Sequence, residues 1–216
     1  MSIGVLFDLD GTLLDSLADL HRCVNDTLRK YGCPERTYEE IRRFVGNGAK
    51  RLVELALPGK EDDPPLDVVY ADYQQYYNEQ CNQGTTCAYP GILEALAAIR
   101  AKYPVAVVSN KPDDAVKELC KEFFGDVYAL GVTPDCPRKP AGDMVWKAMK
   151  AIGVDKCVYV GDSEVDVVTA QNAGVPCLSV LWGFRDKAEI EAVGGKHFCT
   201  KAEEMLPMIE ELMTQL

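Results

Sequence analysis

The chain has 216 residues, a length that suits one large domain or one domain with an insertion. Its 34 acidic and 23 basic residues give a net charge of −11, which disfavours binding to nucleic acid or to an anionic membrane. The nine cysteines are scattered and form no Cys-x-x-Cys pair, which argues against a disulfide framework or a zinc site. Because the sequence shows neither a charged-then-apolar leader nor a run of about 18 apolar residues, we expect a cytoplasmic protein.

The first predicted element is a buried strand that ends at two aspartates. An apolar run over residues 3–7 is followed by Asp8, Asp10 and Gly11. Such a run is typical of a strand covered on both faces in a parallel sheet, and reactive groups collect at the carboxyl ends of these strands. Since residues two apart in extended backbone share a face, Asp8 and Asp10 are placed to act on one small molecule. Two aspartates alone favour a solvated acidic turn, whereas the full string Asp-x-Asp-Gly-Thr is specific enough to favour a site.

The segment that follows, residues 16–83, shows no convincing strand and has the apolar spacing of helices. Leucine and valine recur in it at intervals of three and four residues, as on one face of a helix, and glycine and proline mark the ends. Helices are expected near residues 17–31, 38–44, 47–57 and 67–80. We therefore predict an all-helical insertion directly after the first strand.

A glycine-rich turn before the third of these helices has the composition of an anion site. Gly46 and Gly48 let the backbone approach a ligand, and the helix that begins at Asn47 or Gly48 offers free amides and the positive end of its dipole. Lys50 and Arg51 add positive charge. An ordinary glycine turn followed by two solvated cations fits the same residues equally well, so both interpretations stay open.

Polar residues also stand at the ends of two later strands and in one proline-flanked loop. Ser109 and Asn110 follow one apolar run, Lys139 lies in the loop, and Asp162 and Asp166 follow another apolar run. A serine hydroxyl and nearby backbone amides bind phosphate oxygens well. Taken singly, these residues also fit the start of a loop, a solvated lysine and acids that cap a helix.

Strands and helices alternate through this part of the chain, which predicts an α/β fold with a Rossmann-like parallel sheet covered by helices on both faces. Besides the first strand, strands are expected near residues 105–110, 126–131, 156–161, 177–181 and 197–199. Because the carboxyl ends of parallel strands meet at one edge, Asp8, Ser109 and Asp162 should converge there, together with Lys139.

In chain order, these motifs resemble the four motifs of the haloacid dehalogenase superfamily, most of whose members are phosphatases. The motifs are Asp-x-Asp-Gly-Thr from Asp8, Ser-Asn from Ser109, Lys-Pro from Lys139 and Gly-Asp-x-x-x-Asp ending at Asp166. The resemblance covers the whole chain and implies a catalytic core over residues 1–15 and 84–216. Residues 16–83 would then be a helical cap domain that closes over the site and selects the substrate.

The resemblance also assigns roles in catalysis. Asp8 would be the nucleophile that forms an aspartyl-phosphate, and Asp10 would be the general acid and base. Lys139 would neutralise phosphate charge and hold the nucleophile. Ser109 and Asn110 would bind the oxygens of the phosphate.

A magnesium ion is implied as the cofactor. Its ligands would be the Asp8 carboxylate, the backbone carbonyl of Asp10 and the Asp162 carboxylate, while Asp166 would orient Lys139 or a metal-bound water. The expected partner is a small-molecule phosphate ester, and the protein is expected to be a monomer or a homodimer.

Within the superfamily, the finer pattern resembles the phosphoglycolate phosphatase group. The shared features are the helical cap, its Val-Gly-Asn-Gly turn, and the strings Ser-Asn-Lys, Arg-Lys-Pro and Gly-Asp-Ser-x-x-Asp. This implies 2-phosphoglycolate or a similar small phosphorylated metabolite as the substrate, with the turn and Lys50 or Arg51 in contact with its second anionic group. A pyrophosphatase, a nucleotidase, a phosphosugar mutase and an inactive binding protein on the same scaffold are the alternatives.

Overall fold

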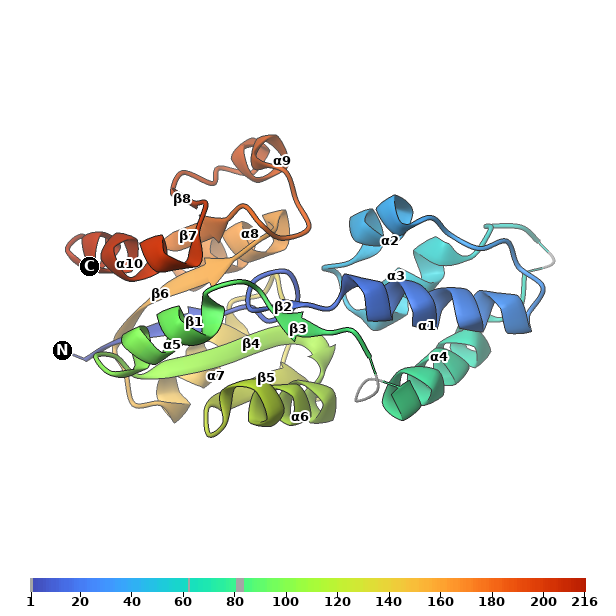
Figure 1. Cartoon of the computed structure of the whole chain (residues 1–216), viewed down its shortest axis with the longest axis horizontal. Coiled ribbons are helices and arrows are strands. Elements are labelled where there is room, and N and C mark those ends of the chain that lie inside the picture. The colour runs from blue at the N-terminus through green and yellow to red at the C-terminus, as the bar shows by residue number, and fades with distance from the viewer. Residues whose placement is uncertain (1, 62, 81–83) are drawn as a thin grey trace. The chain divides into compact units, whose positions relative to one another are not determined.

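The computed structural model describes residues 2–61, 63–80 and 84–216, and the chain divides into two compact units. The larger unit comprises Met1–Leu14 and Ala88–Leu216, and the smaller unit comprises Asp15–Cys87 (Figure 1). The predicted boundary at residue 83 lies outside the described residues. Within the described ranges, no helix combines the length and the apolar character that a membrane span requires.

A parallel sheet of six strands forms the centre of the larger unit, in the order β5-β4-β1-β6-β7-β8. Its strands are β1 (Ile3–Phe7), β4 (Val105–Pro112), β5 (Tyr128–Val132), β6 (Lys156–Gly161), β7 (Cys177–Val180) and β8 (Phe198–Cys199). β1 pairs with β4 on one side and with β6 on the other, so it occupies the interior of the sheet. The predicted parallel α/β fold is confirmed.

Helices cover both faces of this sheet. They are α5 (Ile92–Arg100), α6 (Asp113–Phe124), α7 (Asp143–Ala151), α8 (Glu164–Ala173) and α10 (Met205–Met213), while α9 (Lys187–Ala192) packs against α8. Val5 and Phe7 of β1 pack in one hydrophobic cluster with residues of α5, α6 and α10, whereas Leu6 packs in another with residues of α7 and α8. All three side chains are fully buried, and each such burial contributes roughly 1.5–3 kcal/mol to stability. Because helices cover both faces of β1, apolar residues follow one another in this strand instead of alternating with polar ones.

β4 extends beyond the expected end at Ser109 and Asn110. After a register shift against β5, the strand continues to Pro112. Gly131 of β5 permits this close approach, because a Cβ at that position would lie 2.7 Å from the carbonyl oxygen of Lys111 and 2.4 Å from Asp113 Cα. The extension keeps Lys111 in the strand that runs beside β1.

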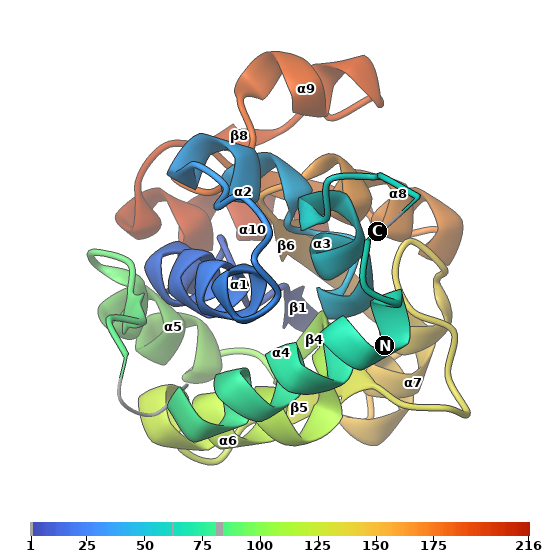
Figure 2. The same ribbon diagram turned by 90° about the vertical axis from the view of Figure 1, so that its right-hand side faces the viewer.

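The smaller unit is helical in its described residues, as the sequence predicted. It contains α1 (Leu17–Lys30), α2 (Tyr38–Phe44), α3 (Ala49–Ala56) and α4 (Leu66–Gln80), which Figure 2 shows from a second direction. Its buried side chains include Leu20, Val24, Leu28, Ile41, Leu52, Val53, Val69, Tyr73 and Tyr77. The short strands β2 (Leu14–Asp15) and β3 (Cys87–Ala88) pair where the chain passes from one unit to the other. The proposal that this unit is a cap rests on the resemblance.

Candidate active site

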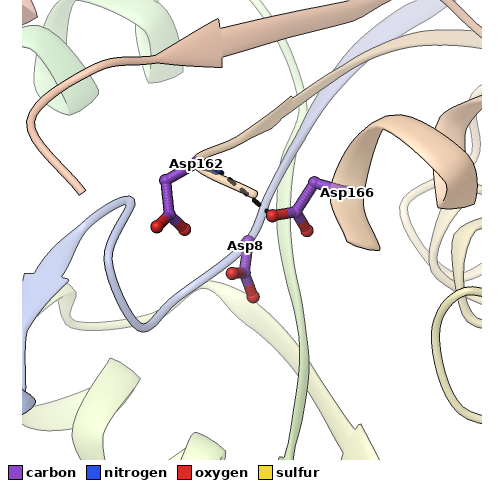
Figure 3. A group of neighbouring side chains, drawn as sticks. All are labelled: Asp8, Asp162 and Asp166. Carbon is purple, nitrogen blue, oxygen red and sulfur yellow. Dashed lines mark hydrogen bonds between the residues drawn. The ribbon is translucent and has the colours of Figure 1, made fainter. Parts of the chain in front are cut away.

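Three aspartates meet at the carboxyl edge of the sheet. Asp8 directly follows β1, Asp162 directly follows β6, and Asp166 lies in the first turn of α8. A carboxylate oxygen from each lies within 4.8 Å of those from the other two, and all three residues are buried. Figure 3 shows the three side chains approaching one another from two strand ends and a helix. Sequence positions up to 158 residues apart thus form one cluster of carboxylates.

A buried lysine pairs with two of these aspartates. Lys139 Nζ lies 2.7 Å from Asp8 Oδ1 and 2.8 Å from Asp166 Oδ1, and it donates to the hydroxyl of Tyr159 at 3.1 Å. Burial by itself would lower the pKa of Lys139, but the carboxylates of Asp166 and Asp8 outweigh this and hold the pKa well above its usual value. Lys139 is therefore protonated and positively charged although its side chain is buried.

Both carboxylate oxygens of Asp166 are engaged within the protein. Oδ1 accepts hydrogen bonds from Lys139 and, at 3.2 Å, from the hydroxyl of Tyr159. Oδ2 accepts from the amide and the hydroxyl of Ser163, at 3.1 and 2.7 Å, and from the amide of Asp162 at 3.2 Å. The side chain thus joins the start of α8, the end of β6 and the loop that carries Lys139. It serves as a helix-start acid and also fits the predicted role of orienting Lys139.

Two loops hold the carboxylate of Asp162. Oδ2 accepts from the amide of Phe184 at 2.7 Å, and Oδ1 accepts from the hydroxyl of Thr12 at 3.2 Å. A Cβ at Gly11 would lie 2.3 Å from Asp162 Oδ2, and a Cβ at Gly183 would lie 2.4 Å from it, so neither position has room for a side chain. Gly11 has a φ of 87°, a backbone conformation that favours glycine and permits the turn after β1. Glycine is required at position 183 because the loop after β7 packs against Asp162.

Asp10, Ser109 and Asn110 are also held by neighbouring groups in the larger unit. Lys111 Nζ lies 2.8 and 2.9 Å from the two carboxylate oxygens of Asp10. The hydroxyl oxygen of Ser109 accepts from the amide of Lys111 at 3.2 Å. The side-chain amide of Asn110 donates to the carbonyl oxygen of Lys139 at 2.9 Å. Asn110 therefore ties β4 to the lysine loop, in addition to its proposed contact with phosphate.

Lys111 and Tyr159 belong to the site although the sequence interpretation assigned them no role. Lys111 follows Ser109 by two residues, so the two share a face if the strand continues. Tyr159 lies between Val158 and Val160 in a buried strand, where a hydroxyl needs a hydrogen-bond partner. The spacing of Lys111 from Ser109 and the tyrosine in a buried strand are both visible in the sequence. Neither feature tells which residue Lys111 or Tyr159 contacts.

Burial and mutual repulsion act against ionisation of Asp8 and Asp162. Burial raises the pKa of Asp8 to about 7, with Lys139 lowering it and the Asp166 and Asp10 carboxylates raising it. Burial likewise raises the pKa of Asp162 well above its usual range, and the charges of Asp166 and Asp8 add to this effect. A positive ion between these carboxylates would favour their ionised forms.

The charge and the donor atoms of the cluster suit a divalent cation. When ionised, the four aspartates described above face two lysines, Lys111 and Lys139, so that two negative charges are left over. One divalent cation would balance them. Carboxylate oxygens are the ligands that Mg²⁺ and Ca²⁺ prefer. The group of Asp8, Asp162 and Asp166 can therefore hold a metal ion.

The predicted anion-binding turn lies in the smaller unit. Gly46 and Gly48 flank Asn47 and have φ values of 119° and 83°, a region of backbone conformation that favours glycine. Gly48 directly precedes α3. Glycine is thus required here for backbone geometry, whether or not the turn also meets a ligand.

The two cations after this turn form ion pairs with acids of the same unit. Lys50 Nζ lies 2.5 Å from Asp67 Oδ1, and Arg51 Nη1 lies 2.6 Å from Glu54 Oε2. The side chains of these residues are between 45% and 84% exposed, so each pair contributes little to stability. A substrate carboxylate that approached Lys50 or Arg51 would compete with these acids.

Comparisons with known proteins support one family. The sequence matches the haloacid dehalogenase-like hydrolases over residues 5–180. It is 37% identical over 200 residues to a phosphoglycolate phosphatase of Rhodobacter capsulatus. The aligned region covers 89% of this chain and 90% of that protein. A phosphoglycolate phosphatase of Pseudomonas putida is 33% identical, over 87% of this chain and 72% of that protein.

A solved structure agrees with these sequence matches. The protein assigned as a phosphoglycolate phosphatase from Lactobacillus delbrueckii subsp. bulgaricus superposes with a TM-score of 0.84 at 35% identity, covering 94% of this chain and 95% of that chain. The resemblance inferred from the four motifs is thereby confirmed. The chain belongs to the haloacid dehalogenase-like hydrolase family and resembles its phosphoglycolate phosphatases.

Proposed function

We propose that the protein is a magnesium-dependent phosphatase that acts on small phosphomonoesters, 2-phosphoglycolate first among them, through an aspartyl-phosphate on Asp8. The observation that carries this proposal is the pairing of a buried carboxylate, Asp8, with a buried ammonium, Lys139, beside the carboxylates of Asp162 and Asp166. The phosphoglycolate phosphatases among the relatives support the choice of substrate.

In this mechanism Asp8 attacks the phosphorus atom, and the bond from phosphorus to the ester oxygen breaks. Asp10 donates a proton to the departing alcohol, so that no alkoxide has to leave. Water then attacks the phosphorus of the aspartyl-phosphate, Asp10 takes up the proton, and the bond to Asp8 breaks to release phosphate. The charge of Lys139 offsets the repulsion between the Asp8 carboxylate and the phosphate oxygens.

The ligands proposed for Mg²⁺ are the Asp8 carboxylate, the Asp162 carboxylate and the backbone carbonyl of Asp10. A bound Mg²⁺ ion supplies positive charge beside the phosphate during transfer. Asp166 is the remaining carboxylate of the cluster, and its oxygens are engaged by Lys139, Tyr159, Ser163 and Asp162. These contacts favour a role for Asp166 in orienting the site.

Removal of divalent cations should abolish phosphate release, and added Mg²⁺ should restore it. Ca²⁺ should inhibit, because it takes more oxygen ligands and tolerates both oxygens of one carboxylate, which would include the attacking oxygen of Asp8. Activity with p-nitrophenyl phosphate in chelator, Mg²⁺ and Ca²⁺ measures this. The melting temperature gives a second readout, since an ion that binds only the folded state raises it. Full activity in chelator would show that the aspartate cluster works without a metal.

The substrate proposal is tested with a panel of phosphorylated metabolites. Phosphate release from 2-phosphoglycolate, a sugar phosphate, a nucleotide and pyrophosphate is compared by kcat/KM, and the sugar phosphate is also checked for isomerisation. We expect 2-phosphoglycolate to rank first. If it ranks far below the other substrates, or if an isomer forms in place of free phosphate, the substrate proposal is wrong while the family assignment stands.

Lys50 and Arg51 of the smaller unit are the proposed contacts for the substrate carboxylate. Lys50→Ala or Arg51→Ala should raise KM for 2-phosphoglycolate more than for an uncharged alkyl phosphate, at a cost of roughly 1.5–3 kcal/mol for one charge-assisted hydrogen bond. Asp67→Asn is the matched control, because it removes the acid that pairs with Lys50 and should leave KM for 2-phosphoglycolate equal or lower. Equal losses on both esters would show that these cations do not bind the carboxylate.

A further inference from the structure

Lys111 and Asp10 form a largely buried ion pair in which both carboxylate oxygens are held. Lys111 Nζ lies 2.8 Å from Asp10 Oδ1 and 2.9 Å from Asp10 Oδ2. The side chain of Lys111 is 6% exposed and that of Asp10 is 13% exposed. Because one ammonium contacts both oxygens at similar distances, it holds the carboxyl group of Asp10 beside β4.

The backbone around Lys111 is itself closely held. Its amide donates to the hydroxyl oxygen of Ser109, and its carbonyl oxygen faces Gly131 of β5, where a Cβ would come within 2.7 Å. The amide of Gly131 donates to Asp113 Oδ1 at 2.8 Å, which fastens β5 to the start of α6. Lys111 therefore projects from a segment fixed on both sides, as required of a group that positions another.

The two aspartates of the first motif thus have separate lysine partners. Lys139 pairs with Asp8, the proposed nucleophile, and Lys111 pairs with Asp10, the proposed acid and base. Strand order explains this division, because β1 lies next to β4, which carries Lys111. Lys139 forms ion pairs with Asp8 and Asp166, whereas Lys111 forms one with Asp10.

We propose that Lys111 is a positioning residue that holds the Asp10 carboxyl group for proton transfer to the leaving oxygen. This inference rests on the proposed function. In the first step the phosphorus–ester oxygen bond breaks as the bond to Asp8 forms, and the leaving oxygen receives the Asp10 proton. In the second step a water proton returns to Asp10 as phosphate leaves Asp8. Lys111 acts through Asp10 in both steps and exchanges no proton with the substrate.

The dependence of kcat/KM on the leaving group distinguishes a residue that positions Asp10 from one with a structural role alone. The value of kcat/KM reports the reaction up to formation of the aspartyl-phosphate, before water enters. p-Nitrophenolate leaves readily without a proton, whereas an alkoxide does not. Lys111→Met should therefore lower kcat/KM for an uncharged alkyl phosphate and for 2-phosphoglycolate by roughly 10- to 100-fold more than for p-nitrophenyl phosphate. Lys111→Arg should restore part of this difference.

Two further variants separate positioning from other effects. Lys117→Met is the matched control, because Lys117 is an exposed lysine paired with Asp113 on α6, and no leaving-group effect is expected. In an Asp10→Asn background, Lys111→Met should cause no further change in leaving-group dependence, because residues that act through one another are not additive. Melting temperatures establish that each variant is folded.

Each other result overturns the inference. Equal losses on all three esters would make Lys111 a structural or phosphate-binding residue. A loss confined to KM for 2-phosphoglycolate would make it a carboxylate-binding residue. An undiminished effect in the Asp10→Asn background would show that it acts elsewhere. If wild-type protein with Mg²⁺ hydrolyses none of the esters, the proposed function fails, and this inference with it.

Discussion

Replacing Asp8 by asparagine is expected to reduce phosphatase turnover below detection. The amide has nearly the shape of the carboxylate but is not a nucleophile and binds a divalent cation poorly. The substitution also removes one negative charge, so Lys139 loses its ion pair with residue 8 and keeps the one with Asp166. In the proposed mechanism the covalent intermediate forms on an oxygen of Asp8, so its loss should stop the first step. The measurement is phosphate release from 2-phosphoglycolate and p-nitrophenyl phosphate at saturating Mg²⁺.

The covalent step has a readout of its own. Acid quenching of the wild-type enzyme during turnover should trap a phosphoryl group on the peptide that contains Asp8, and mass spectrometry detects it. Asp135→Asn is the matched control, since Asp135 is an exposed aspartate that pairs with Lys147 and lies outside the cluster. Turnover of Asp8→Asn near the wild-type rate would refute the covalent mechanism.

Lys139→Met is expected to destabilise the fold as well as abolish activity. The side chain of Lys139 is 2% exposed, and its removal leaves Asp8 and Asp166 buried without their counter-charge. Breaking a buried ion pair by removing one partner costs roughly 3–5 kcal/mol. Tyr159 also loses the ammonium that donates to its hydroxyl. The free energy of unfolding, measured by urea denaturation in chelator, should fall by about this amount relative to wild type.

The control for Lys139 is a lysine with the same kind of partner at the surface. Lys147 pairs with Asp135 at 3.0 Å, but their side chains are 40% and 73% exposed. Lys147→Met should therefore change the free energy of unfolding by no more than about 1 kcal/mol and leave activity intact. If Lys139→Met unfolded at the same urea concentration as wild type, the buried network would not be holding the site together.

Much of the site could be predicted from the sequence because its residues follow recognisable strands. The apolar run of β1 predicts a doubly covered strand, and Asp8 and Asp10 come directly after it. The run of β6 in the same way precedes Asp162. Parallel strands present their carboxyl ends at a common edge, so the positions of Asp8 and Asp162 at those ends are enough to predict that the two lie close together. The helical character of the smaller unit followed from apolar spacing alone.

Pairings between distant side chains could not be predicted in this way. Asp10 and Lys111 are 101 residues apart in sequence, and they meet because β4 lies beside β1 and continues to Pro112 after its register shift. Tyr159 gains its partner because the loop carrying Lys139 brings the lysine ammonium to the tyrosine hydroxyl. Lys50, for which the sequence left open an anion contact or a solvated cation, pairs with Asp67 because α3 packs near the start of α4.

The sequence by itself therefore determined the α/β class, the helical insertion and the carboxylates that stand at the strand ends, since these depend on local apolar pattern and on residue type. Only the tertiary structure decided which lysine holds which aspartate and where glycine is required, as at Gly183 against Asp162. Such contacts depend on strand order, register and loop paths, which bring together groups that the local sequence does not relate.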